Sequence, residues 1–500
     1  MALKKKLPSP ITILMFVIIA AAGATWLIPA GQYNRLAYSA DTGFTINMAN
    51  KDTVVPLTQH TLDSLQIKIS LEKFKLGAIR KPVSIPGTYH KMPANGQGWL
   101  QVLQAPLKGI TETIDIILFL LIIGGFMNIF NESGALVLGL TSLSHNMKGR
   151  EAWLIIILTF LFSFAGASYG MAEEALVFYP VMVPLFLAAG YDLLVPVAVI
   201  FAGTQLGTLS SFTNPFSTII ASNAAGVNWS NGLSGRILMF LLSTTLTIIY
   251  LVRYANKVKK DPTASIVYRV DGEVTSPYPA ISDTEAAVPK LAMRTKLLLL
   301  LFLFTFLIMI GGVVLKDWWL LEMSTLFLGS SILLAVILRM KEKTFITQFI
   351  KGAEGLLSVA FIVGVARGVT IMLNEGHISD SILYYAAQMV GGMPPALFIV
   401  MLLALFMVFT LFISSSSGMA VLTMPIMGAL AIMVNVPGRE IVNTYLFGMG
   451  IMGFMTPTGL ILPSLALVNV SLKAWWKFIS PLLIMLFVLC AVFLIVGIYL

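Results

Sequence analysis

The sequence predicts an all-α polytopic membrane protein made of two inverted repeats, with about nine transmembrane helices and two re-entrant hairpins. Hydrophobic residues make up 57% of its 500 residues and charged residues 11%, whereas soluble domains have roughly 45–50% and 25%. The motif Lys108-Gly109, an apolar span and Asn131-Glu132 recurs 243 residues later as Lys351-Gly352, an apolar span and Asn374-Glu375. A repeat at a fixed offset indicates that one structural unit occurs twice.

The composition excludes several classes of function. The net charge of +9 is explained by loop lysines and arginines that orient a membrane protein, so we expect no nucleic-acid partner. Cys490 is the only cysteine, and the four histidines do not have the spacing of metal ligands. We therefore expect no disulfide, no metal site of Cys and His ligands, and no cofactor.

The first 98 residues divide into a membrane helix and a polar insert. Three lysines at positions 4–6 precede an apolar run from Ile11 to Ala30, which is longer than the core of a cleaved signal peptide. Residues 1–30 are therefore predicted to form the first transmembrane helix, with the N-terminus in the cytoplasm. Residues 31–98 are rich in turn-forming residues and are predicted to form an extramembrane insert on the periplasmic face.

Basic residues set the orientation of the other spans. They gather at 148–150, 253–260, 339–343 and 473–477, which we place on the cytoplasmic side by the positive-inside rule. The predicted spans are 113–131, 193–226 (interrupted), 233–254, 295–315, 318–338, 354–373, 440–470 (interrupted) and 476–499. The predicted domains are repeat 1 at 99–254, a cytoplasmic linker at 255–292, a pair of helices at 293–340 and repeat 2 at 341–500.

This orientation requires that residues 151–190 and 393–435 each enter and leave the membrane on one face, as re-entrant hairpins. Both contain the sequence Gly-Met-Ala at the expected tip, at 170–172 and 418–420. The first hairpin is expected to open to the cytoplasm and the second to the outside, so the two repeats are inverted. Secondary transporters commonly have this organisation.

Two adjacent acids, Glu173 and Glu174, follow the first tip inside apolar sequence. A carboxylate at bilayer depth costs at least about 2.5 kcal/mol on insertion scales. We expect both side chains to face protein, water or a ligand rather than lipid.

Each repeat also contains an interrupted helix, broken near Asn214-Pro215 in the first and near Thr456-Pro457 in the second. A half-helix N-terminus attracts anions, and exposed carbonyl groups coordinate Na⁺ or a proton-carrying group. A Na⁺ ion at Asn214 and Thr456 is one such possibility. The alternative is that these small and hydroxylated residues only allow close helix packing. The candidate substrate- or ion-binding residues are Ser168, Glu173, Glu174, Ser211, Thr213, Asn214, Ser415, Ser416, Ser417, Thr456 and Thr458.

Arg367 is a further charged residue inside a predicted span. It is assigned either a substrate or gating role, or a charge pair with an acid such as Glu375 or one on the facing helix. His377 follows Glu375 at a predicted helix break, where it is expected to cap the helix or to shuttle protons.

The repeated Lys-Gly and Asn-Glu motifs, together with four other stretches, resemble the YfcC-like branch of the DcuC-type carriers, in the ion transporter superfamily. The stretches are GASYGMAEEALVFYPVMVPL, SSFTNPF, SSSSGMAVLTMPIM and GFMTPTGLILP. The resemblance extends over essentially the whole chain. It implies a carrier of the bacterial inner membrane, with a scaffold domain that forms a homodimer and includes the helices of 293–340. It also implies a transport domain that holds both hairpins and moves as an elevator, with coupling to Na⁺ or H⁺, or exchange.

Members of this group are associated either with C4-dicarboxylates or with basic amino acids. Neither tip and neither break contains a lysine or arginine, which a dicarboxylate site would need. Glu173 and Glu174 favour a cationic group, so we expect a basic amino acid or small peptide as substrate. A carboxylate substrate stays possible if one of the two acids is instead the proton or Na⁺ site. A channel is a more distant alternative, and no arrangement of an enzyme's nucleophile and base is visible.

Overall fold

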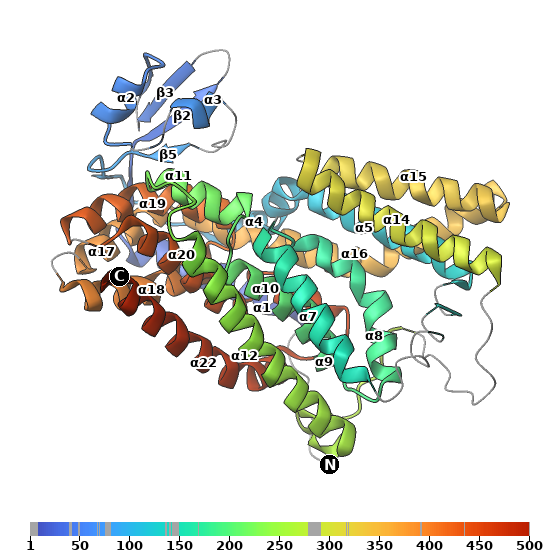
Figure 1. Ribbon diagram of the computed structural model, residues 1–500. Coiled ribbons are helices and arrows are strands. Elements are labelled where there is room, and N and C mark those ends of the chain that lie inside the picture. The colour runs from blue at the N-terminus through green and yellow to red at the C-terminus, as the bar shows by residue number, and fades with distance from the viewer. Residues whose placement is uncertain are drawn as a thin grey trace.

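The computed structural model describes residues 9–39, 43–48, 51–67, 69, 71–75, 82–135, 138–139, 142, 150–168, 170–278, 292–316, 318, 320–390, 393–434 and 436–499. Helices dominate this part of the chain (Figure 1). The helices are α1 (Pro10–Leu27), α2 (Gln59–Ser64), α3 (Leu71–Lys75), α4 (Trp99–Glu112), α5 (Ile114–Glu132), α7 (Glu151–Ser168), η1 (Glu173–Phe178), α8 (Tyr179–Ala188), α9 (Leu194–Val197), η2 (Ala198–Ala202), α10 (Gly203–Leu209), η3 (Pro215–Ile219), α11 (Ile220–Ala224), α12 (Leu233–Lys260), η4 (Pro262–Ala264), α13 (Ile266–Asp271), α14 (Met293–Lys316), α15 (Leu320–Leu338), α16 (Glu342–Glu375), α17 (Ser379–Val390), α18 (Pro395–Phe412), α19 (Ser416–Met433), α20 (Gly438–Gly453), α21 (Ile461–Ala466) and α22 (Leu472–Tyr499).

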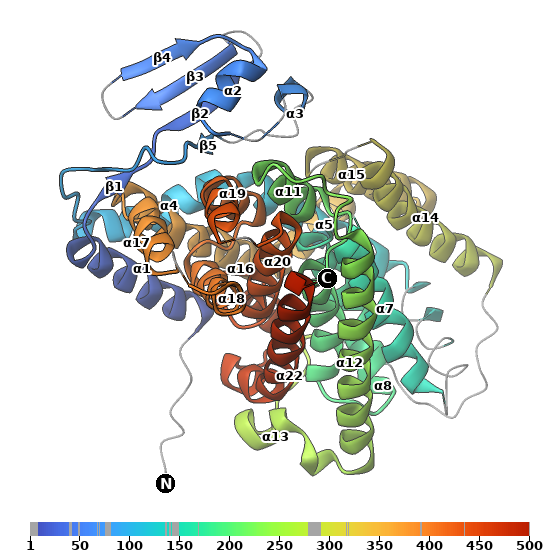
Figure 2. The ribbon, with the colours of Figure 1, turned by 60° about the vertical axis from the view of Figure 1, so that its left-hand side comes forward.

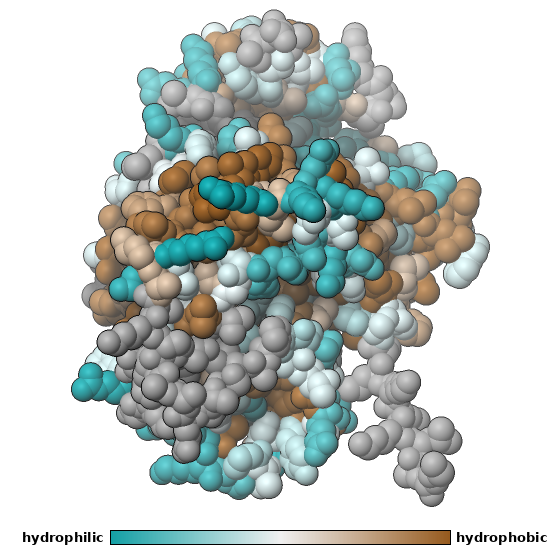
Figure 3. Space-filling model, turned by 90° about the vertical axis from the view of Figure 1, so that its right-hand side faces the viewer, coloured by the Kyte–Doolittle hydropathy of each residue, from teal (hydrophilic) through white to brown (hydrophobic). Residues whose placement is uncertain are grey.

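Eight of the described helices are long and apolar enough to cross a membrane, namely α1, α5, α7, α12, α15, α16, α18 and α22. The chain is therefore a mostly helical, polytopic membrane protein, as predicted. Large apolar side chains of α14 and α15, such as Leu303, Phe304 and Val336, are exposed. Figure 3 shows the hydrophobic surface that gathers below the β unit on this side of the molecule. Lipid is the solvent that suits such a surface.

The predicted insert at 31–98 contains a small β unit, which is an exception to the all-α expectation. Its four-stranded antiparallel sheet has the order β4-β3-β2-β5, and β1 pairs with β6. The register aligns Arg35 with Asn47 and Phe44 with Val55. The strands are β1 (Gly31–Gln32), β2 (Arg35–Ser39), β3 (Gly43–Met48), β4 (Lys51–Val55), β5 (Val83–Ser84) and β6 (His90–Lys91). Alternation of buried and less buried residues along β3 is typical of a sheet with one covered face.

The β unit and the segment around α13 lie at opposite ends of the helical body (Figure 2). At the α13 end, Lys259 of α12 pairs with Glu151 at 2.9 Å and lies 5.6 Å from the ring centre of Tyr191. The first residue of α7 and the residues after α8 therefore lie at the same end of the molecule. The half-buried Asp192 accepts hydrogen bonds from Tyr254 and Ser265, although desolvation raises the pKa of this carboxyl group.

The second predicted hairpin is anchored at the other end. Helix α19 packs against β5 and α17, and α17 packs against β1 and α18. Figure 2 shows α17 and α19 next to the β unit. The contacts named for α7 and for the residues after α8 therefore lie at one end of the molecule, and those named for α17 and α19 lie at the other end. An inverted arrangement of the two hairpins stays a prediction.

Equivalent glycine contacts recur in the two halves of the chain. If Gly203 of α10 carried a Cβ atom, that atom would lie 2.8 Å from Cβ of Phe162 in α7. If Gly448 of α20 carried one, it would lie 2.6 Å from Cβ of Phe406 in α18. At these distances any side chain in place of glycine would clash. The glycines therefore allow the two helices of each pair to pack closely. The pairs α7–α10 and α18–α20 are the ones that two repeats of one fold would place in contact.

The inverted arrangement predicts that exposed residues at the bases of the two hairpins face opposite sides of the membrane. Arg150 and Pro394 are exposed, and the buried Cys490 can be replaced by Ala to give a cysteine-free background. With a membrane-impermeant maleimide, we expect Pro394→Cys to react in intact cells and Arg150→Cys to react only after permeabilisation. Labelling of both positions from the same side would contradict the inverted arrangement.

Candidate functional site

The first helix break separates α10 from η3 and is capped by Asn214. The Asn214 Oδ1 atom accepts hydrogen bonds from the backbone N–H groups of Phe216 at 2.8 Å and Ser217 at 3.2 Å. Pro215 occupies the first helical position, where its missing N–H costs nothing. The sequence Asn-Pro therefore starts the second half-helix, and the side-chain oxygen satisfies two N–H groups that would otherwise be unpaired.

The same break is hydrogen-bonded to the last turn of α7. Thr213 donates its N–H to the carbonyl of Ala167 at 3.2 Å and its hydroxyl to the carbonyl of Ser168 at 2.9 Å. The Asn214 Nδ2 atom donates to the carbonyl of Gly166 at 3.1 Å. These carbonyl groups have no partner within their own helix. The hydrogen bonds from Thr213 and Asn214 therefore satisfy the acceptors at the end of α7.

A cluster of hydroxyl groups lies directly behind this break. The side chains of Ser211, Ser217 and Thr218 are fully buried. The Ser211 Oγ atom is 2.5 Å from Thr218 Oγ1 and accepts a hydrogen bond from Ser217 at 3.2 Å. Of these three, only Ser211 was selected from the sequence, although the stretch SSFTNPFST has hydroxylated residues on both sides of Asn-Pro.

The second break, between α20 and α21, repeats this arrangement. The hydroxyls of Thr456 and Thr458 lie 2.9 Å apart, and both donate to the carbonyl of Leu411, at 3.5 and 3.2 Å. Leu411 lies near the end of α18 and is 243 residues from Ser168, and Thr456 is 243 residues from Thr213. The same threonine-to-helix-end hydrogen bond therefore occurs in both halves at the offset of the sequence repeat.

Two tryptophans that we did not select from the sequence donate hydrogen bonds to backbone carbonyls at the second break. Trp475 and Trp476 of α22 donate their indole N–H groups to the carbonyls of Phe454 and Met455, at 2.8 and 3.2 Å. These carbonyls belong to the end of α20. The pair of adjacent tryptophans at the start of the last apolar run was the only available signal, and it did not reveal which carbonyls they contact.

Helices α10 and α20, which precede the two breaks, pack against each other near the centre of the ribbon (Figure 1). A Cβ atom on Gly450 would lie 2.3 Å from Cβ of Leu209, and Gln205 Nε2 would lie 2.0 Å from a Cβ atom on Gly453. Leu209 thus meets Gly450 while Gln205 meets Gly453, so the two helices run antiparallel at their contact. The first break therefore follows Leu209 at one end of this contact, and the second follows Gly453 at the other end.

The two acids follow the turn that packs against the first break. Gly170, with φ of +87°, forms the turn after α7, and a Cβ atom there would lie 2.8 Å from Asn214 Oδ1. Glu173 and Glu174 begin η1, which packs against η2 and α5. Glu174 is 9% exposed, and its Oε2 atom accepts a hydrogen bond from the N–H of Ala172 at 3.0 Å. Glu173 is more exposed than Glu174.

The serines of the second tip are half-buried. Ser415 Oγ accepts a hydrogen bond from the N–H of Gly418 at 3.2 Å, and the carbonyl of Ser416 accepts one from the hydroxyl of Tyr445 at 2.8 Å. Ser417, in the first turn of α19, is also half-buried. The structure therefore places Ser415, Ser416 and Ser417 at the start of α19, where their backbone N–H groups begin the helix.

Arg367 forms a charge pair with the facing helix. Its Nε atom lies 2.7 Å from Glu112 Oε2 of α4. Glu375, the other partner considered from the sequence, pairs instead with Lys108 at 2.5 Å. A further buried polar group was missed. Glu440 accepts hydrogen bonds from Arg439 and Asn443.

These features define a polytopic membrane protein with two interrupted helices at its centre. Residues 7–499 match the DcuC family, described as C4-dicarboxylate anaerobic carrier, and the chain belongs to this family. It is therefore a membrane transporter and not an enzyme.

The relatives of the chain cover its whole length. An uncharacterized protein of Haemophilus influenzae is 39% identical to this chain, and the match covers 98% of this chain and 97% of that protein. The putative basic amino acid antiporter YfcC of Escherichia coli is 28% identical over 97% of this chain and 95% of its own. Among solved structures, the Alcanivorax borkumensis YdaH transporter matches with a TM-score of 0.41 at 12% identity, covering 98% of each chain. Neisseria gonorrhoeae MtrF matches with a TM-score of 0.39 at 14% identity, covering 100% of this chain and 96% of its own.

Removal of the Asn214 side chain is expected to destabilise the first break and to abolish transport. Asn214→Ala loses the cap of η3 and the bond to Gly166, and loss of a cap costs about 1 kcal/mol. Asn214→Asp keeps the acceptor for the two N–H groups and should be closer to the wild type in stability. Thermal unfolding of the purified carrier in detergent measures this difference. Asn47→Ala, in the β unit, is the control, and an Asn214→Ala variant as stable and active as this control would contradict the assignment.

Proposed function

We propose that the protein is a secondary active transporter that moves amino acids across the bacterial inner membrane by ion coupling or exchange. Basic amino acids or small peptides are the proposed substrates. The observation that carries this proposal is the pair of interrupted helices, whose first halves α10 and α20 pack against each other. Glu173 and Glu174 follow Gly170, which packs against Asn214 of the first break, by three and four residues. Interrupted helices at a repeat interface are the usual place for a substrate site in such carriers.

The charge of the site favours a substrate with a cationic group. The stretches 168–178, 210–215, 412–420 and 454–460 contain two acids and no lysine or arginine. A side-chain ammonium or guanidinium group would compensate the two carboxylates, while backbone N–H groups at the starts of the half-helices would bind the α-carboxylate. The E. coli relative named as a putative basic amino acid antiporter supports this choice.

A C4-dicarboxylate is the second candidate substrate, because the description of the family names it. A dianion would have to bind mainly through N–H groups and hydroxyls at the breaks and the second tip. It would also require that Glu173 and Glu174 be protonated or hold a cation. The absence of a basic residue from these four stretches makes this the less favoured assignment.

Transport is proposed to occur by an elevator movement within a homodimer. Helices α5 and α16 form a tightly packed pair: a Cβ atom on Gly124 would lie 2.4 Å from the carbonyl oxygen of Gly352, and one on Gly352 would lie 2.2 Å from that of Gly124. Such close packing suits a rigid scaffold that also includes α14 and α15. The two hairpin segments and both interrupted helices would move against this scaffold as the transport domain.

Glu173 and Glu174 are proposed to divide the work of binding and coupling. Two adjacent carboxylates in a low dielectric do not both stay ionised without a cation. One would therefore pair with the substrate cation, and the other would bind the coupling proton or Na⁺. Asn214, Thr456 and the hydroxyl cluster at Ser211 supply oxygen atoms for a Na⁺ ion close to the breaks.

Uptake by proteoliposomes tests the substrate class. Purified carrier should accumulate or exchange radiolabelled arginine, lysine or ornithine, and an excess of unlabelled succinate should not compete. Saturable counterflow would also distinguish a carrier from a channel. Transport of succinate alone would overturn the assignment of an amino acid substrate and leave the carrier class intact.

Single substitutions of the two acids test the division of work. At the position that pairs with substrate, Glu→Gln should weaken binding of lysine by about 2–5 kcal/mol, because a desolvated cation loses its partner. At the other position, Glu→Gln should preserve exchange but abolish the response to an ion gradient. Glu72→Gln, which changes an exposed acid of the β unit, is the matched control. If Glu173→Gln and Glu174→Gln both behave like this control, neither acid has the proposed role.

A further inference from the structure

Helix α4 has an unusual distribution of side chains for a helix next to lipid. Leu100, Leu103 and Leu107 form an exposed apolar face, with exposures of 62%, 49% and 65%. A second face, formed by Val102, Ala105 and Gly109, is buried and packs against α16. The third face carries Gln101, Gln104 and Lys108, at spacings of three and four residues, which a helix places in one row.

This polar row lines a cavity near the β unit. The cavity has a volume of about 370 Å³ and is lined by Asn95, Gln97, Gln101, Gln104, Lys108, Glu375 and His377. The cavity is wide open to its surroundings, and its volume is large enough to hold a small molecule. Four side-chain amides and one pair of opposite charges face one space, and no large apolar side chain lines it.

The wall of the cavity is held in place by its own hydrogen bonds. Asn95 donates to the carbonyl of Glu375 at 2.7 Å, and Gln97 donates to the carbonyl of Asn95 at 2.9 Å. Gln101 accepts a hydrogen bond from the N–H of Gly98 at 3.1 Å. The amide of Gln101 is therefore fixed through its oxygen, which leaves its NH₂ group to face other partners.

The repeat shows that the amide row is not a requirement of the fold. An offset of 243 residues places Thr344, Thr347 and Lys351 at the positions of Gln101, Gln104 and Lys108. The lysine is shared by the two repeats, whereas the two glutamines occur only in the first. A role that belongs to one end of the molecule explains this difference better than a packing role common to both repeats.

The ion pair in the cavity is easily opened. Lys108 Nζ lies 2.5 Å from Glu375 Oε1, and the two side chains are 42% and 37% exposed. An ion pair exposed to this extent contributes little to stability. A zwitterion inserted between the two side chains would exchange one ion pair for two, with its carboxylate on Lys108 and its ammonium group on Glu375.

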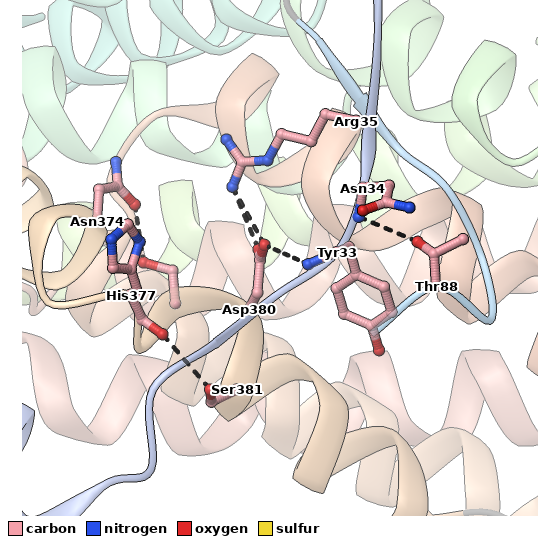
Figure 4. Close-up of polar contacts among 9 residues, drawn as sticks. Tyr33, Asn34, Arg35, Thr88, Asn374, His377, Asp380 and Ser381 are labelled. Carbon is pink, nitrogen blue, oxygen red and sulfur yellow. Dashed lines mark hydrogen bonds and ion pairs between the residues drawn. The ribbon is translucent and has the colours of Figure 1, made fainter. Parts of the chain in front are cut away.

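A neighbouring cavity also contains an ion pair, but the acid of that pair is buried. It has a volume of about 140 Å³ and shares His377 with the larger cavity. Figure 4 shows Asp380 facing Arg35 and the backbone of Tyr33 there. Asp380 is 2% exposed and accepts hydrogen bonds from Tyr33 N at 3.0 Å and from Arg35 at 3.3 Å. The ion pair of Arg35 with Asp380 attaches the β unit to α17. The buried carboxylate of Asp380 is used for that attachment.

We propose that the larger cavity is a second binding site for free α-amino acids, separate from the helix breaks, that recognises the zwitterionic head group through Lys108 and Glu375. Because the site has no net charge, it selects a zwitterion over a dicarboxylate and over a simple diamine. It lies at the β-unit end of the molecule, where residues 95 and 97 form part of its wall. The proposal deepens the proposed function, on which it rests for the substrate class.

Equilibrium binding of radiolabelled lysine to the purified full-length carrier tests this site. The wild type should bind two lysines per chain, and the double variant Lys108→Gln/Glu375→Gln should bind one. The charge-swapped variant Lys108→Glu/Glu375→Lys should restore the second lysine, because both charges are again present. Cadaverine, which lacks a carboxylate, should not compete for this second lysine. Lys91→Gln, which removes an exposed lysine of the β unit, should behave like the wild type.

The outcomes separate this proposal from the proposed function. If the wild type transports lysine and the Lys108→Gln/Glu375→Gln variant binds it with unchanged stoichiometry and affinity, the second site is wrong and the transport assignment stands. If the wild type does not transport any amino acid but loses lysine binding in this variant, the cavity is a binding site and the proposed function is wrong. If the wild type binds no lysine at all, both are wrong.

Discussion

The structure depends on how the backbone groups at two interrupted helices find partners inside apolar sequence. In lipid each unpaired N–H or carbonyl costs several kcal/mol, so irregular backbone is stable only when protein or a water-filled cavity surrounds it. Thr213 and Thr456 solve this problem in the same way, because the Thr213 hydroxyl donates to a carbonyl at the end of α7 and the Thr456 hydroxyl to one at the end of α18. Asn214 and the two tryptophans of α22 satisfy other groups at the breaks.

This arrangement has a consequence for movement. The close contact of Leu209 with Gly450 joins the two half-helices before their breaks, so a shift of one break displaces the other. A substrate at this place would contact both halves of the chain at once. The glycine-lined contact between α5 and α16 lies apart from these breaks, which is compatible with one group of helices moving while another stays fixed.

The sequence predicted the parts of this arrangement that depend on local chemistry. The breaks at Asn214 and Thr456 were located because proline and hydroxylated residues interrupt apolar runs, and both positions follow helix ends in the structure. Helix orientation could be argued from basic residues alone. The repeat was visible because its motifs have a constant offset.

Pairings between distant residues could not be predicted. Arg367 had two possible acidic partners, and the choice of Glu112 depends on the packing of α4 on α16. The caps from Trp475 and Trp476, the group around Glu440 and the sheet order of the β unit likewise depend on contacts between segments far apart in the chain. One sequence shows that such residues are polar or aromatic in an unusual place, but not which residue each one meets.

The most direct test of this account compares the threonine hydrogen bonds at the first break with those at the second. Thr213→Val removes the first bond, and Thr456→Val/Thr458→Val removes both donors to Leu411. Thermal unfolding of the purified carrier should show that both variants are less stable than the wild type, by about 1 kcal/mol per lost hydrogen bond, and both should lose transport. If only one of the two variants is destabilised and inactive, the breaks are not equivalent, and the account of two matching halves is wrong.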